Sequence, residues 1–193
     1  MNEVKTKSAG LADLRIEPVR SDEIDRLLAI ERDSFTVPWT RKMFEAELSD
    51  NPFSRLDVAR VPGPVAGTFT VIGFVCYWVV FDELHLLDVA VEPAYRRRGV
   101  GRRLVAHALA RGVEQAVRRA MLEVRLSNEA AGRLYEGFGF RMTGTRPKYY
   151  TNPVEDARLL ELPMASRLGM SSGCDEGGKG IERAAPTPPL REA

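Results

Sequence analysis

The pattern of apolar and polar positions divides the chain into strand-like and helix-like segments. Short apolar or alternating runs predict strands at about 14–19, 56–61, 71–80, 84–91, 120–126, 140–150 and 158–162. Apolar residues at helical spacing predict helices at about 21–35, 40–49, 100–117 and 127–138. The first strands are expected to form an antiparallel meander, and later strands alternate with helices. This order predicts an α/β fold built on a mixed sheet.

The two ends of the chain lack this periodicity. Residues 1–10 are polar and are expected to form a flexible N-terminal arm. Residues 165–193 are rich in Gly, Ser and Pro and carry too few apolar side chains to offset the entropy cost of ordering. We therefore expect one folded domain at 11–164, followed by a disordered tail.

The most informative segment joins a buried strand to a helix through a glycine-containing turn. The strand ends near Val91 and is stopped by Pro93, which cannot donate to a ladder. Gly99 and Gly101 then let the backbone approach a ligand closely. A helix N-terminus offers unpaired amides, and five arginines at 96–103 add positive charge. The turn therefore suits a phosphate, with a basic helix start and two ordinary turn glycines as the alternative.

Composition excludes several other kinds of site. A formal net charge of +1 argues against a general nucleic-acid or DNA binder. Two cysteines and two histidines make neither a disulfide framework nor a metal-ligand pattern, so no metal is expected. The N-terminus has no signal-peptide core, and the apolar run at 71–81 is interrupted and too short to span a bilayer. We expect a soluble cytoplasmic protein, with no membrane partner, that is a monomer or weak dimer.

Three sequence patterns resemble a known family. Arg96-x-x-Gly99-x-Gly101, after a strand ending in Val-Ala-Val, is similar to the acetyl-CoA pyrophosphate loop of the GNAT superfamily of N-acetyltransferases. The patterns around Glu123 and around Tyr135 resemble the RimI-type ribosomal-protein-alanine N-acetyltransferases within it. The similarity covers about residues 16–162. It implies a central twisted, mostly antiparallel sheet with a splay between two parallel strands and with helices on both faces.

The resemblance implies that acetyl-CoA is the co-substrate. By this similarity, backbone groups of the strand end hold the acetyl and pantetheine parts, and amides of the turn hold the pyrophosphate. Asn128 falls on a cofactor-contacting asparagine, although capping a helix explains it equally well. The implied cofactor-binding residues are Val89, Ala90, Val91, Arg96, Arg97, Arg98, Gly99, Val100, Gly101, Arg102 and Asn128.

The same resemblance assigns a base and an acid. Glu123 lies in the middle of a predicted strand, where burial among apolar neighbours would raise its pKa towards a value useful in a general base. Arg125 shares its strand face, so a simple Glu–Arg pair is the alternative. Tyr135 lies on the inward stripe of a predicted helix and could donate to the CoA sulfur, or could be an ordinary core tyrosine.

Aromatic residues near two predicted loops resemble the acceptor side of these enzymes. Phe35 and Trp39 precede the second helix, and Tyr149 and Tyr150 precede the last turn. They could wall a groove for an extended peptide terminus or could anchor the loops. The implied acceptor is the N-terminal α-amine of a protein, in particular the N-terminal alanine of a small-subunit ribosomal protein. A lysine or small-amine acetyltransferase and an RNA- or ribosome-binding module are the alternatives.

Overall fold

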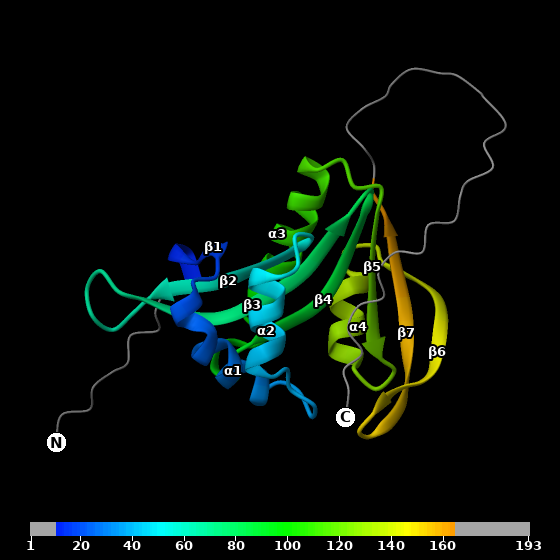
Figure 1. Cartoon of the computed structure of the whole chain (residues 1–193), viewed down its shortest axis with the longest axis horizontal. Helices are drawn as coiled ribbons and strands as arrows, with labels where there is room; N and C mark the ends of the chain where they lie inside the picture. The colour runs from blue at the N-terminus through cyan, green and yellow to red at the C-terminus, as the bar shows by residue number, and fades with distance from the viewer. Residues whose placement is uncertain (1–10, 165–193) are drawn as a thin grey trace, which may run out of the picture. The chain divides into compact units, whose positions relative to one another are not determined.

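The computed structural model describes residues 11–164, so the predicted N-terminal arm and C-terminal tail lie outside the described residues. The strands are β1 (Arg15–Pro18), β2 (Ser54–Pro62), β3 (Phe69–Val80), β4 (Glu83–Val91), β5 (Arg119–Arg125), β6 (Arg141–Thr151) and β7 (Val154–Pro163) (Figure 1). The α-helices are α1 (Ile24–Arg32), α2 (Arg41–Ser49), α3 (Val100–Glu114) and α4 (Glu129–Glu136). Short 3-10 helices are η1 (Leu11–Asp13), η2 (Ser21–Glu23) and η3 (Pro93–Tyr95).

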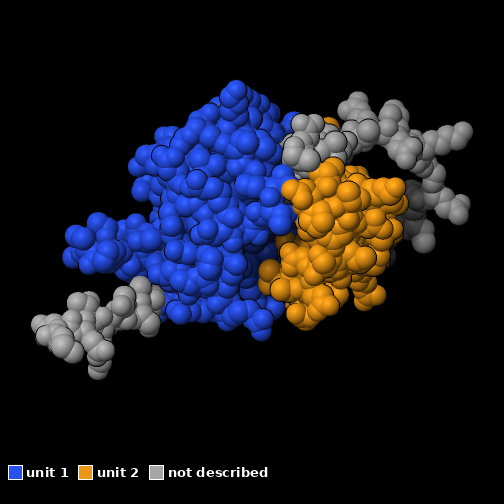
Figure 2. Space-filling view, turned by 90° about the horizontal axis from the view of Figure 1, so that it is seen from below, with its two compact units in different colours: residues 1–78, 86–109 blue, residues 79–85, 110–193 orange. Residues whose placement is uncertain are grey.

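Hydrogen-bonded neighbours in the sheet follow the order β1-β2-β3-β4-β5-β7-β6. The α/β fold with a mixed sheet is therefore confirmed. The described residues form two compact units, coloured separately in Figure 2. Unit 1 comprises residues 11–78 and 86–109, and unit 2 comprises residues 79–85 and 110–164.

Unit 1 has helices on both faces of its strands (Figure 1). The strands β1, β2 and β3 pair antiparallel, as the predicted meander requires. On one face, α1 and α2 cover a core to which β2, β3 and β4 contribute alternate side chains; its members include Leu27, Ile30, Phe44, Val58 and Phe74. On the other face lies α3, whose His107 Nε2 is 3.0 Å from Asp57 Oδ2 on β2.

Unit 2 contains a three-stranded antiparallel arrangement in which β7 lies between β5 and β6. Residue burial alternates along β5, so Ala120, Leu122 and Val124 share the buried face. Leu126 lies beyond the end of the strand and is exposed. In β6 the register shifts between Arg146 and Tyr150, so this strand is irregular next to its turn.

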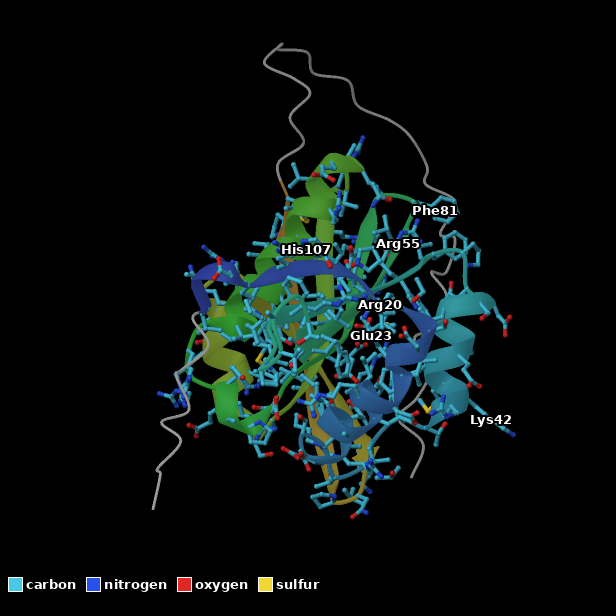
Figure 3. All side chains as sticks on the ribbon, turned by 90° about the vertical axis from the view of Figure 1, so that its left-hand side faces the viewer. Arg20, Glu23, Lys42, Arg55, Phe81 and His107 are labelled. Carbon is cyan, nitrogen blue, oxygen red and sulfur yellow. The ribbon has the colours of Figure 1, made fainter. Side chains whose placement is uncertain are left out.

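A buried ion-pair cluster fixes the start of α1 to β2. The side chain of Arg60 is 3% exposed, and its Nη2 lies 2.5 Å from Glu23 Oε2. Arg60 Nη1 also lies 2.8 Å from Glu17 Oε2. Arg20 donates to Glu23 from its backbone N–H and its guanidinium, and the two side chains lie close together in Figure 3. The cluster therefore stabilises β1, η2 and β2 against one another.

Burial opposes ionisation of Glu23, but the hydrogen bonds and charges of Arg60 and Arg20 outweigh it and lower the pKa of Glu23 below its ordinary value of 4.5. The stability that this carboxylate contributes is therefore fully present above about pH 4.5 and is lost as the pH falls through the lower folded-state pKa. We predict that Glu23→Gln lowers the free energy of unfolding by about 3 kcal/mol near pH 7, and by much less near pH 3.

Urea denaturation at both pH values measures this difference. Glu17→Gln is the matched control, because Glu17 pairs with the same arginine but its side chain is 49% exposed. Its expected cost is below about 1 kcal/mol. An equal loss of stability in the two variants, or a loss in Glu23→Gln that does not depend on pH, would contradict the account.

Candidate active site

The turn between β4 and α3 has the geometry of an anion site. Gly99 has φ +82°, a left-handed conformation that favours glycine, and an added Cβ would meet no heavy atom within 4 Å. The N–H of Arg103 donates to Gly99 O at 3.0 Å, which is the first hydrogen bond of the helix. The backbone N–H groups of Val100 and Gly101 lie before this bond, so no carbonyl within α3 is placed to accept from them. Open space beside unpaired helix amides suits the pyrophosphate of a CoA ester.

Two of the five arginines that the sequence places here have other tasks. Arg96 Nε donates to Val91 O at 2.8 Å, and its Nη2 donates to Asp33 O at 2.9 Å and Ser34 Oγ at 3.0 Å. Arg103 donates to the carbonyls of Leu11 and Leu14. These two side chains therefore hold backbone segments of unit 1 together. Because these acceptors are neutral oxygens, both guanidinium groups keep their positive charge near the turn while they position its backbone.

The strand end that was predicted to hold acetyl and pantetheine lies where expected. Ala90 is buried in the core under α1 and α2, while Val89 and Val91 are half-buried. The carbonyl of Val91 accepts the hydrogen bond from Arg96. In this way Arg96 links the last residue of β4 to the turn that precedes α3.

Glu123 lies in the middle of β5 and is partly buried, with its side chain 18% exposed. Its ion-pair partner is Arg146 on β6, whose Nη1 lies 3.3 Å from Glu123 Oε1. The alternative partner considered from the sequence, Arg125, instead reaches Glu155, at 3.2 Å. Glu123 and Arg125 lie on the same face of β5, so they could have paired with each other. Instead each pairs with a residue of another strand, Glu123 with Arg146 on β6 and Arg125 with Glu155 on β7.

Tyr135 and Asn128 belong to α4. Tyr135 is 8% exposed, and its ring contacts Phe140 edge to face at 5.8 Å between centroids. The side chain of Asn128 caps the helix by accepting from Ala131 N–H at 3.1 Å. The last helical residue is Glu136, and the helix terminates through Gly139: the N–H of Gly139 donates to Glu136 O at 2.9 Å, and that of Phe140 donates to Tyr135 O at 3.2 Å. Gly139 does adopt a left-handed conformation, with φ +93°.

The first aromatic pair lies in and against a core rather than on a surface. Trp39 is 4% exposed and packs edge to face on Phe44, with 5.3 Å between ring centroids. Its backbone N–H donates to the buried carboxylate of Glu31 at 2.9 Å. Phe35 is partly buried against the same cluster. These contacts are those of a loop anchor, which was the alternative to a substrate-contacting role.

The second aromatic pair lies near the end of strand β6, inside the strand predicted at 140–150 and directly before the last turn. The rings of Tyr149 and Tyr150 meet at 86°, with centroids 5.1 Å apart. The guanidinium of Arg125 lies 4.1 Å from the Tyr150 ring centroid, and that of Arg146 lies 5.5 Å from Tyr149. The register shift in β6 explains the irregular backbone here, because Lys148 has φ +53°.

The sequence analysis assigned no role to Arg146 and Glu155, which organise this part of unit 2. Glu155 accepts hydrogen bonds from the backbone N–H and hydroxyl of Ser127 and from Arg125. Desolvation opposes ionisation of Glu155, but these hydrogen bonds outweigh it and lower its pKa. Arg125 also donates to the carbonyls of Asn152 and Pro153. The network thus ties the β6–β7 turn to the residue that precedes the N-cap of α4.

The structure therefore gathers the predicted residues into two groups. Unit 1 carries the glycine turn, the end of β4 and Trp39, and unit 2 carries Glu123, Tyr135, Asn128 and the tyrosine pair. Within residues 11–164, no three His, Cys, Asp or Glu side chains are grouped so that they could hold a metal ion. No helix in this described part is long and apolar enough to cross a membrane.

Comparison with known proteins agrees with this geometry. Residues 24–140 match the acetyltransferase (GNAT) family. A relative from Bacillus subtilis (strain 168), provisionally named a ribosomal protein bS18-alanine N-acetyltransferase, is 36% identical over 157 residues, which are 81% of this chain and 96% of the relative.

Two solved structures are also similar. The ribosomal-protein-S18-alanine N-acetyltransferase from Escherichia coli superposes with a TM-score of 0.71 and 30% identity, over 83% of this chain and 99% of that one. Arabidopsis thaliana NAA60 in complex with acetyl-CoA shares the fold, with a TM-score of 0.71 and 21% identity, over 78% of this chain and 98% of that one. The chain belongs to the acetyltransferase (GNAT) family, and it is similar to the ribosomal-protein-alanine N-acetyltransferases within that family.

Proposed function

We propose that this enzyme transfers the acetyl group of acetyl-CoA to the N-terminal α-amine of a protein, and that the acceptor is the N-terminal alanine of ribosomal protein S18. The observation that carries the proposal is the extent of the similarity to the Escherichia coli enzyme. It covers 99% of that chain at 30% identity, and the family match at residues 24–140 includes the turn, β5 and α4. The commitment of Arg96 and Arg103 to backbone carbonyls argues against the alternative of an RNA-binding surface at this turn.

Acetyl-CoA binding is assigned to the turn and to the end of β4. The amides at 97–102 would hold the pyrophosphate, since Gly99 leaves the space open and α3 starts there. Backbone groups of Val89, Ala90 and Val91 would hold the acetyl and pantetheine parts. The co-substrate supplies an activated thioester, and the residues of the chain orient it.

The chemistry requires a neutral amine and a protonated leaving group. Near pH 7 roughly a tenth of an α-amine is neutral, against on the order of one in a thousand for a lysine side chain. We assign Glu123 as the base that accepts the proton of the incoming ammonium, directly or through a water. As the C–N bond forms and the C–S bond breaks, the hydroxyl of Tyr135 gives a proton to the departing CoA thiolate. The nitrogen, now bonded to the acetyl carbon, loses its second proton, and this proton restores the Tyr135 hydroxyl.

The first prediction concerns these two proton transfers. Glu123→Gln should lower kcat by about 10²–10⁴ and flatten the rise of rate with pH, because a general base must be ionised. Tyr135→Phe should also lower kcat but keep the acidic limb of the profile. Steady-state kinetics over a range of pH measures both effects, with acetyl-CoA affinity as the control that should not change. Near-parental kcat and pH profile in both variants would mean that positioning alone drives the reaction.

The second prediction concerns the glycine turn. Gly99→Ala should weaken acetyl-CoA binding about tenfold, or roughly 1.4 kcal/mol, because a side chain would enter the phosphate space. Isothermal titration calorimetry measures the dissociation constant. Gly67→Ala is the matched control, since Gly67 has φ +81° and equally open surroundings but lies in the β2–β3 loop. Equal affinities of the two folded variants would remove the turn from the account.

The acceptor is tested with a panel of short peptides. The panel combines free or blocked N-termini with the presence or absence of an internal lysine, and includes peptides that begin with alanine. Mass spectrometry of the products should place the acetyl group on the α-nitrogen of peptides with free N-termini. Preferential acetylation of lysine in the blocked peptides would favour a lysine acetyltransferase and would overturn the proposed acceptor.

A further inference from the structure

Arg146 reaches Glu123 across the middle strand of unit 2. Glu123 on β5 pairs with Leu159 on β7, which in turn pairs with Gly144 on β6. Paired residues in antiparallel strands point to the same face, and so does Arg146, two positions after Gly144. Gly144 has no side chain to stand between them. The guanidinium of Arg146 can therefore cross β7 diagonally to the carboxylate of Glu123.

The contact between Arg146 and Glu123 is an ion pair that leaves the carboxylate able to accept a proton. Arg146 Nη1 lies 3.3 Å from Oε1 of Glu123. Among residues 11–164 this is the one ion pair that Glu123 makes, and Oε2 accepts no hydrogen bond from another described group. The second cation on this face, Arg125, points instead to Glu155 and to the β6–β7 turn. Arg146 thus lies against Glu123 on the side of Oε1 without a hydrogen bond to it, so the carboxylate can receive a proton.

The same guanidinium contacts the aromatic pair. Arg146 lies 5.5 Å from the Tyr149 ring centroid, and Tyr149 meets Tyr150 edge to face. Tyr149 lies within the register shift of β6, so its position is not set by a regular ladder with β7. A cation over its ring supplies a directional contact in place of that ladder. Arg146 therefore connects the carboxylate on β5 to the tyrosine pair next to the last turn.

We propose that Arg146 is a positioning residue, which holds Oε1 of Glu123 and the ring of Tyr149 in fixed relation so that Oε2 can take the acceptor's proton. This inference rests on the proposed role of Glu123 as the base. A purely structural surface pair would act on stability alone. A positioning pair would act on turnover through Glu123, and on the KM of the peptide through Tyr149, without changing the KM of acetyl-CoA.

The test is a double-mutant cycle with Arg146→Met and Glu123→Gln. Arg146→Met should lower kcat about fivefold, the equivalent of roughly 1 kcal/mol for a partly exposed pair, and should raise the KM of a peptide that begins with alanine. In the Glu123→Gln background the same change should have almost no further effect on kcat, because no carboxylate remains to be held. Arg146→Lys, which keeps the charge, should recover most of kcat.

Arg141→Met is the matched control, because Arg141 is an exposed cation at the start of the same strand. Circular dichroism and urea denaturation establish that each variant is folded. Multiplicative losses of kcat in the double variant, or a loss equal to that of Arg141→Met, would overturn the positioning role while leaving Glu123 as the base. Parental kcat in Glu123→Gln alone would overturn the base assignment and this inference with it.

Discussion

The turn from β4 into α3 is the constraint on which the proposed acetyl-CoA site depends. Both Arg97, with φ +61°, and Gly99, with φ +82°, adopt left-handed conformations there, and its free amides exist because a helix starts directly after it. Arg96 gives the turn its position, since one guanidinium binds the last carbonyl of β4 and the segment after α1. Arg96, which the sequence suggests as a phosphate ligand, therefore holds two backbone segments together. In the function that we propose, backbone amides bind the anion, and this would require no ordering of side chains on binding.

A comparable constraint governs the chemistry that we assign to unit 2. The alternation of β5 directs Glu123 to the opposite face from Leu122 and Val124. Two arginines lie on the face of Glu123, and each pairs with a different carboxylate. Arg125 stabilises the β6–β7 turn, and Arg146 binds Glu123. If both arginines paired with Glu123, the turn would lose the donor to its carbonyls. The division keeps each charge paired with one carboxylate in a partly buried setting.

Much of the fold could be predicted from the local sequence pattern. Which side chains contact one another in the candidate site could mostly not be predicted in this way. Periodicity located every strand and α-helix to within a few residues, because burial on one face leaves a repeating signature. The partner of Glu123 depends on strand order and register, which the local pattern does not contain. The burial of Trp39 depends on how α2 packs on the sheet, and the irregular strand at Tyr149 depends on a register shift. The resemblance supplied the identity of the ligand, which the spacing of two glycines alone left open.

The central claim is that this chain acetylates the N-terminal alanine of ribosomal protein S18, and the most direct measurement is made in the cells that produce it. Ribosomes are purified from the parent strain and from a strain that lacks this chain, and the N-terminal peptide of S18 is analysed by mass spectrometry. The account predicts an acetylated terminus in the parent, a free amine in the deletion strain, and restoration by the parental chain but not by its Glu123→Gln variant. An S18 terminus that is equally acetylated in both strains would contradict it.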